Sequence, residues 1–226
     1  MIFRTRGAGG GVATALLASS KLSLFLFVCR AISSHSNRYW FLVWNLTLAW
    51  LPLAFAWWLK TRLHKHSWLS WQSILLSLLW LGFLPNSFYL ISDFVHLYST
   101  GEVSLLFDSV MFMSFAWNGL ILGFASVIII HLELMKRLRQ KMVLLWLGLV
   151  FLLCSFAIYL GRYLGWNTWD ILVNPAGILF DLSDRIVKPT SYPNTFTTTG
   201  MFFVMLTTTY FTTYRLFTAV RGSHKV

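Results

Sequence analysis

Residues 109–130 read SVMFMSFAWNGLILGFASVIII and contain no Asp, Glu, Lys, Arg or His. A helix rises about 1.5 Å per residue, so about 20 apolar residues cross the roughly 30 Å hydrocarbon core of a bilayer. Four further stretches of 20 to 26 residues also lack these five residue types. This pattern predicts a protein that crosses a membrane several times. The further stretches cover residues 39–59, 67–92, 142–161 and 189–214.

The composition agrees with a membrane protein. Hydrophobic residues make up 57% of the chain, charged residues only 11%, and the mean hydropathy is +0.67. A soluble domain carries about 25% charged residues. Spans and short loops nearly fill the 226 residues, so we expect an all-α transmembrane helical bundle that forms a single membrane domain over residues 1–226.

The N-terminal stretch resembles a signal peptide because a basic start precedes an apolar run. Lys21 divides that run, and no small-x-small cleavage pattern follows it before Arg30. We therefore expect an uncleaved first span. The six predicted spans are residues 11–31, 39–59, 67–84, 109–130, 142–161 and 195–214, and the segments expected at the outer face are residues 85–104 and 162–194.

The distribution of basic residues predicts the orientation. Twelve Lys and Arg residues fall on the side that would hold both termini, and five fall on the other side. The positive-inside rule therefore places both termini in the cytoplasm and accounts for the formal net charge of +11. Six of the seven acidic residues fall on the outer side. We expect the lipid bilayer, and beyond it other membrane-protein subunits, as partners, and not nucleic acid.

The segment that follows the third span carries polar residues at helical spacing. Pro85 disfavours a helical conformation at Leu84, which predicts a break there and a new short helix at the outer interface. One face of that helix would be polar, either meeting water or forming part of a site. The residues expected on this face are Tyr89, Asp93, His96 and Thr100.

Asn118 lies near the middle of the fourth span. A buried amide in hydrocarbon needs a hydrogen-bond partner, so we expect it to face another helix, near Asn45 or Asn86, and not lipid. Gly119 and Gly123 form a G-x-x-x-G pattern beside it. This pattern is a weak indication of close helix contact.

The second outer segment contains its own helix signals. A short helix should carry Asp170, and the dipeptide Asn174-Pro175 should end it and start a second amphipathic piece. Asp181 and Arg185 are four residues apart on that piece, which predicts a local ion pair. The segment has too many polar residues to span a bilayer, so we expect it at the outer interface or folded back over the bundle.

Four long motifs resemble a known family. They are NLTLAWLPLAFAW (45–57), FLPNSFYLISDFVHL (83–97), SFAWNGLILGF (114–124) and IYLGRYLGWNTWD (158–170). These are similar to motifs of the bacterial membrane proteins grouped as domain of unknown function 1361, over about residues 41–215. The resemblance implies a multi-pass protein of a bacterial plasma membrane. It supplies no activity, cofactor or catalytic residue.

Two classes of function stay open at this point. The chain contains no known catalytic motif, which favours an accessory, assembly or small transport-related membrane protein with a polar cluster at its outer face. The alternative is a membrane-embedded enzyme that acts there on an amphipathic or lipid-linked substrate and could depend on a metal. No feature assigns a cofactor, and whether the chain is an enzyme is uncertain from the sequence.

The candidate residues for such an enzyme lie in the outer segments. The catalytic candidates are Asp93, His96, Arg162 and Asp170, and the weaker metal candidates are Asp93, His96 and Asp108, because imidazole and carboxylate ligands suit zinc, manganese or iron. Asp108 is most simply the N-cap of the fourth span. An arginine near the hydrocarbon boundary needs an acidic partner, so we expect Arg162 to pair with one of the three aspartates, and His96 to border the same pocket.

Overall fold

The computed structural model describes residues 8–223, whose regular elements are all helices, with no strand within that range. This confirms the predicted all-α fold. The elements are α1 (Ala8–Ser34), α2 (Trp40–Leu63), α3 (Trp71–Ser92), a 3₁₀ turn η1 (Asp93–His96), α4 (Leu105–Met135), α5 (Gln140–Leu164), α6 (Asp170–Val173), α7 (Pro175–Val187), a 3₁₀ turn η2 (Pro189–Ser191) and α8 (Pro193–Ser223).

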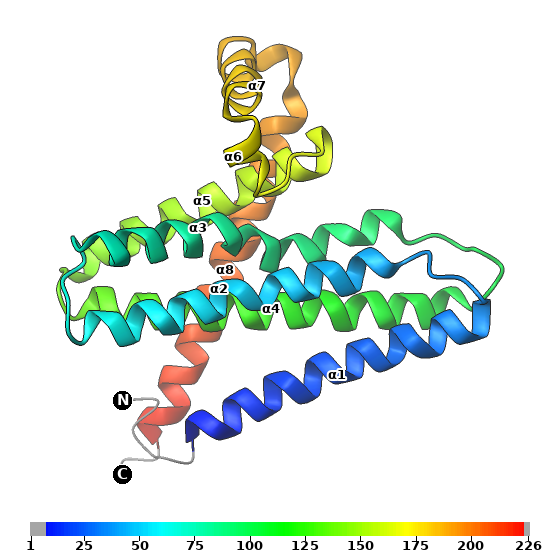
Figure 1. Ribbon diagram of the computed structural model, residues 1–226, viewed down its shortest axis with the longest axis horizontal. Coiled ribbons are helices and arrows are strands. Elements are labelled where there is room, and N and C mark those ends of the chain that lie inside the picture. The colour runs from blue at the N-terminus through cyan, green and yellow to red at the C-terminus, as the bar shows by residue number, and fades with distance from the viewer. Residues whose placement is uncertain (1–7, 224–226) are drawn as a thin grey trace. The chain divides into compact units, whose positions relative to one another are not determined.

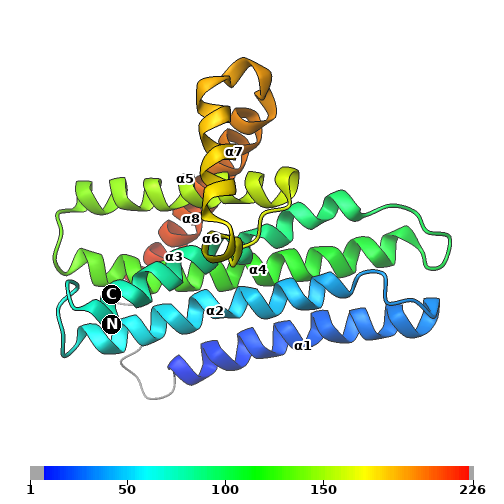
Figure 2. The ribbon, with the colours of Figure 1, turned by 45° about the horizontal axis from the view of Figure 1, so that its top comes forward.

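The chain divides into two compact units, Met1–Ile130 and His131–Val226, and the boundary falls inside α4. Within the first unit, α1, α2, α3 and α4 alternate in direction (Figures 1 and 2). The α1–α2 and α3–α4 connections therefore lie at one end of this unit, and the α2–α3 connection lies at the other. The single membrane domain over the whole chain stays a prediction.

Within residues 8–223, five helices are long and apolar enough to cross a membrane. They begin and end at Gly10–Ser34, Trp40–Leu63, Trp71–His96, Leu105–Met135 and Gln140–Leu164. The sixth predicted span, residues 195–214, lies within α8, which has 31 residues but is rich in threonine, with Thr-Thr-Thr at residues 197–199 and 207–209. By length and composition α8 is not among the five, so its crossing stays a prediction.

The expected helix break at Pro85 was wrong. Helix α3 runs through this proline to Ser92 and continues into η1. Prolines are tolerated in membrane helices where nearby polar groups bond backbone carbonyls. Beside Pro85, the Asn86 side-chain amide donates to the Phe83 carbonyl at 3.1 Å, and the Ser87 hydroxyl donates to the Ala49 carbonyl at 3.0 Å, which ties this part of α3 to α2.

The continuous α3 changes the outer segment that was expected over residues 85–104. The first half of that segment belongs to the third span. The second half, residues 97–104, forms no helix. Tyr89 lies on α3, Asp93 and His96 lie in η1, and Thr100 lies in the loop. The polar face of a separate interfacial helix was therefore a wrong prediction.

The predicted N-cap role of Asp108 was also wrong. Helix α4 begins at Leu105, and the Ser104 hydroxyl accepts a hydrogen bond from the Phe107 amide at 3.2 Å, as an N-cap side chain does. Asp108 lies in the first turn, where its own amide donates to the Ser104 carbonyl. Its carboxylate is thereby free to bond a side chain from another helix.

The glycine pair of α4 makes a close contact with α3, as the G-x-x-x-G pattern indicated. A Cβ atom on Gly119 would lie 2.2 Å from the Ser87 carbonyl oxygen, and one on Gly123 would lie 2.5 Å from the Phe88 ring. Only a hydrogen fits at these two positions. Small residues at a helix interface let two backbones approach closely.

In the second unit, α5 packs against α8, and the predicted break at Asn174-Pro175 is confirmed. The Asn174 side-chain oxygen accepts from the Gly177 amide at 3.0 Å and so caps α7. The predicted ion pair on α7 is confirmed as well, with 3.3 Å between Arg185 Nη1 and Asp181 Oδ1.

Candidate functional site

Arg30 of α1 is the centre of a buried charge cluster at the end of the first unit where the α1–α2 and α3–α4 connections lie (Figure 1). Its side chain has no exposed surface. Its Nη2 lies 3.0 Å from Glu102 Oε2 in the α3–α4 loop, and its Nε lies 3.3 Å from Asp108 Oδ1 on α4. Its Nη1 donates to the Ser34 hydroxyl at 2.9 Å. A buried guanidinium is stable only with such partners.

Arg38 extends the cluster to the surface. Its Nη2 lies 3.3 Å from the second oxygen of Glu102, and its Nη1 donates to the Tyr98 hydroxyl. The Tyr98 hydroxyl, and after it the Glu102 carboxylate, raise the pKa of Arg38. The Arg30 guanidinium also lies over the Tyr39 ring, 4.6 Å from its centroid. Two arginines therefore share one glutamate and tie the two connections together.

Asp93 and His96, the catalytic candidates of η1, have different surroundings. Asp93 is buried, and its Oδ2 accepts a hydrogen bond from the Asn45 amide of α2 at 3.0 Å. His96 is exposed, and its ring meets the Phe41 ring edge-on at 5.2 Å between centroids. The buried carboxylate serves a helix contact, so the imidazole is the more accessible of the two groups.

The geometry offers little to a metal ion. Within residues 8–223 no group of three His, Cys, Asp or Glu side chains could hold one. Of the metal candidates, Asp93 bonds Asn45 and Asp108 bonds Arg30. The metal-dependent alternative gains no support from these donors.

Arg162 and Asp170 lie in the second unit. Arg162 is in the last turn of α5, and Asp170 opens α6, where its Oδ2 accepts from the Asn167 amide at 2.6 Å. The ion pair between Arg162 and an aspartate stays a prediction, as does the border that His96 would form with it. The buried arginine of this unit is Arg185, which is 6% exposed and donates to the Tyr159 hydroxyl at 3.1 Å.

Arg30 was not predicted as a site residue. It was counted only among the five basic residues of the outer side. A usable signal was present, because an arginine at the end of an apolar helix needs an acidic partner. Glu102 and Asp108 were both expected on the same membrane side as Arg30.

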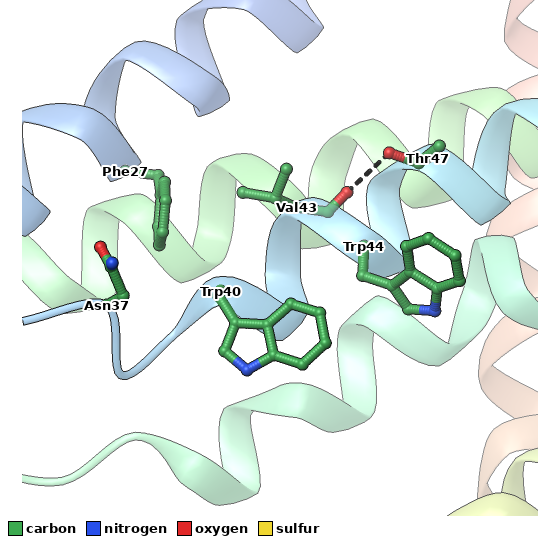
Figure 3. A pocket seen from close by; sticks show the side chains of 6 residues that line it. All are labelled: Phe27, Asn37, Trp40, Val43, Trp44 and Thr47. Carbon is green, nitrogen blue, oxygen red and sulfur yellow. Dashed lines mark hydrogen bonds between the residues drawn. The ribbon is translucent and has the colours of Figure 1, made fainter.

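A shallow hollow of about 440 Å³ is lined by residues of α1, the α1–α2 connection and the start of α2 (Figure 3). Its polar lining residues are Asn37, in the α1–α2 connection, and Thr47 of α2. Two tryptophans also line it, Trp40 and Trp44, which are 60% and 47% exposed. Its lining contains no acid, histidine or cysteine, so it offers a surface for apolar groups and no catalytic side chain. The lining residues are Phe27, Asn37, Trp40, Val43, Trp44 and Thr47.

Asn118 faces α1, as expected of an intramembrane amide. Its Nδ2 donates to the Ser23 hydroxyl at 2.7 Å, to the Ser19 carbonyl at 3.1 Å and to the Ser114 carbonyl of its own helix at 2.9 Å. The prediction that it faces another helix and not lipid is confirmed. Its partners on that helix are serine groups and not the asparagines that were expected.

We expect Asn118→Leu to lower the free energy of unfolding only mildly. Hydrogen bonds between membrane helices contribute about 0.6 kcal/mol on average and seldom more than roughly 2 kcal/mol. The Asn118 Oδ1 atom is buried without a hydrogen-bond partner among the described residues, and its removal offsets part of the loss. Thermal unfolding in detergent measures the change, and complete failure to fold would contradict it.

The comparisons with known proteins give a family and no activity. A family model described as "Protein of unknown function (DUF1361)" matches residues 44–211. No curated protein and no solved structure matches the chain.

Proposed function

The chain belongs to the family described as protein of unknown function (DUF1361), and from that premise we propose that it is a non-catalytic accessory or assembly protein of the membrane. In this proposal the charge cluster around Arg30 is a structural clamp at the outer end of the helices. The exposed apolar surfaces then contact lipid and other membrane subunits.

The observation that carries this proposal is that all three nitrogens of the buried Arg30 guanidinium bond neighbouring side chains. Arg30 uses Nε, Nη1 and Nη2 on three different side chains, and Glu102 uses one oxygen for Arg30 and the other for Arg38. A catalytic centre instead presents charged groups to a cavity that substrate can enter. The hollow between α1 and the start of α2 has Asn37 and Thr47 as its polar lining residues and no charged side chain.

We further propose that the chain lies in a bacterial plasma membrane with six spans, both termini in the cytoplasm and the cluster outside. The excess of Lys and Arg on one side supports this orientation. In the first unit, the loop that carries Lys65 and the loop that carries Glu102 lie at opposite ends (Figure 2). Two loops at opposite ends of a spanning bundle meet opposite compartments.

Cysteine labelling of intact cells tests the orientation. In a background without the two native cysteines, we expect Ser99→Cys, near Glu102, to react with a membrane-impermeant maleimide. Lys65→Cys and Arg139→Cys should react only after the membrane is permeabilised. All three positions are exposed. Labelling of Lys65→Cys in intact cells, together with protection of Ser99→Cys, would overturn the orientation.

One observation favours the enzyme alternative. Asp108 Oδ2 and the Tyr39 hydroxyl are buried and have no hydrogen-bond partner within the described part of the chain. Both residues contact Arg30. Unsatisfied polar atoms beside a buried charge occur in working sites as well as in structural ones. The two proposals make different predictions about the charges of Arg30 and Asp108. An enzyme needs these charges for activity, whereas a structural clamp needs them only for folding.

Complementation separates the two proposals. In cells that lack the chain, membrane complexes are compared by native electrophoresis after supplying wild type, His96→Ala or the double variant Arg30→Met/Asp108→Leu. We expect both variants to restore the wild-type pattern, since His96 is exposed and the double variant removes both buried charges together. A variant that folds to wild-type amounts but fails to restore the pattern would overturn the non-catalytic proposal.

A further inference from the structure

Helix α7 presents an apolar face away from the residues that hold it in place. Leu179, Phe180 and Val187 are 63%, 72% and 74% exposed. Phe180 and Val187 are seven residues apart, which places them on one side of the helix two turns apart. Ala176 and Ser183 lie on the same side and are also exposed. The only polar side chain among these residues is the Ser183 hydroxyl.

The charged residues of α7 point the other way. Asp181 accepts a hydrogen bond from the Trp166 indole at 2.8 Å, and Arg185 donates to the Tyr159 hydroxyl of α5 at 3.1 Å. Asp184 accepts from the Tyr192 hydroxyl at 2.6 Å. A helix surrounded by water places its charges outward and its apolar residues inward. The polarity of α7 is the reverse, so its outer environment is apolar.

The position of α7 in the chain identifies that environment as the bilayer surface. The helix begins at Pro175, eleven residues after α5, a candidate membrane span, ends at Leu164. Trp166 and Trp169 lie between the two helices, and tryptophan is enriched at the headgroup level. The Lys188 side chain at the end of α7 is 61% exposed, and its ammonium lies 2.8 Å from Asp184 Oδ1, so the two charges that lie nearest the apolar face are paired with each other.

We propose that α7 is an interfacial helix that inserts Leu179, Phe180 and Val187 among the lipid headgroups and upper acyl chains where α5 ends. The contacts of Asp181 and Arg185 with Trp166 and Tyr159 hold the helix in this orientation. The occupant of the apolar face is lipid. The inference is independent of whether the protein is an accessory protein or an enzyme.

Spin labelling tests this placement. Single cysteines at Phe180 and Val187, in a background without native cysteines, carry a nitroxide label in vesicles of phosphatidylcholine and phosphatidylglycerol. Collision rates are measured with oxygen, which concentrates in lipid, and with a water-soluble nickel chelate. Leu145→Cys, at a position 68% exposed on the α5 span, gives the lipid reference, and Lys65→Cys, in an exposed loop, gives the water reference.

We expect the labels at Phe180 and Val187 to favour oxygen over the nickel chelate, as at Leu145. A preference for the nickel chelate, as at Lys65, would show that the face meets water and would overturn the proposal. Protection from both reagents would show that protein covers the face, either another part of this chain, a second copy or a partner, and would overturn it equally. Leu179→Cys, on the same exposed face, provides a third position if one variant fails to fold.

Discussion

Arg30→Met is expected to lower the free energy of unfolding by about 3–5 kcal/mol, the usual cost of removing one member of a buried ion pair. The substitution keeps an unbranched side chain of similar length but leaves the fully buried Asp108 carboxylate without its guanidinium. The loss of Arg30 destabilises the Glu102 carboxylate less, because this carboxylate is partly exposed and keeps its ion pair with Arg38. Thermal unfolding in detergent and the yield of folded protein measure the effect.

Two matched variants identify the cause. Arg30→Met/Asp108→Leu removes both charges, and replacement of a buried pair by apolar residues is often neutral or stabilising, so most of the lost stability should return. Arg38→Met removes an arginine that is 40% exposed, and exposed pairs contribute about 0–1 kcal/mol. If Arg30→Met unfolds at the wild-type temperature, the buried cluster does not stabilise the fold.

Gly119→Ala is the second change for which we expect a large effect. The added methyl group would lie 2.2 Å from the Ser87 carbonyl oxygen and 2.8 Å from the Leu90 side chain. The nearest atom belongs to the backbone of α3, so relief requires the two helices to separate. Overpacking of this kind costs about 1–3 kcal/mol, and the Ser87 hydrogen bond to α2 would be strained at the same time.

Gly148→Ala is the control, because apart from its chain neighbours and the adjoining backbone of α5 itself no atom lies within 4 Å of the position that its Cβ would occupy. Alanine is favoured over glycine in a helix interior by about 1 kcal/mol, so this variant should be as stable as wild type or more stable. Equal effects of the two alanine substitutions on thermal unfolding would contradict the close contact between α3 and α4.

Several predictions failed where a residue's role depends on other helices. The rule that a proline disfavours helix at the preceding residue is a local tendency. Helix α3 continues through Pro85, where Leu84 and Phe88 are buried and Ser87 bonds the α2 backbone, so this part of the helix is held by packing against other helices. Asp108 has the residue type and position of an N-cap. Ser104 takes that role, and the aspartate bonds an arginine of α1.

Five apolar helical spans, the break at Asn174-Pro175, the Asp181–Arg185 pair and the need of Asn118 for a helix partner could be predicted from the sequence alone. Each follows from neighbours within one or two turns or from the thickness of a bilayer. The tertiary structure decided which arginine became buried, since Arg30 and Asp108 are 78 residues apart. Several arginines and acids met the same local criteria. Only the packing of α1 against α4 excluded water from this pair, and burial is what makes an ion pair indispensable.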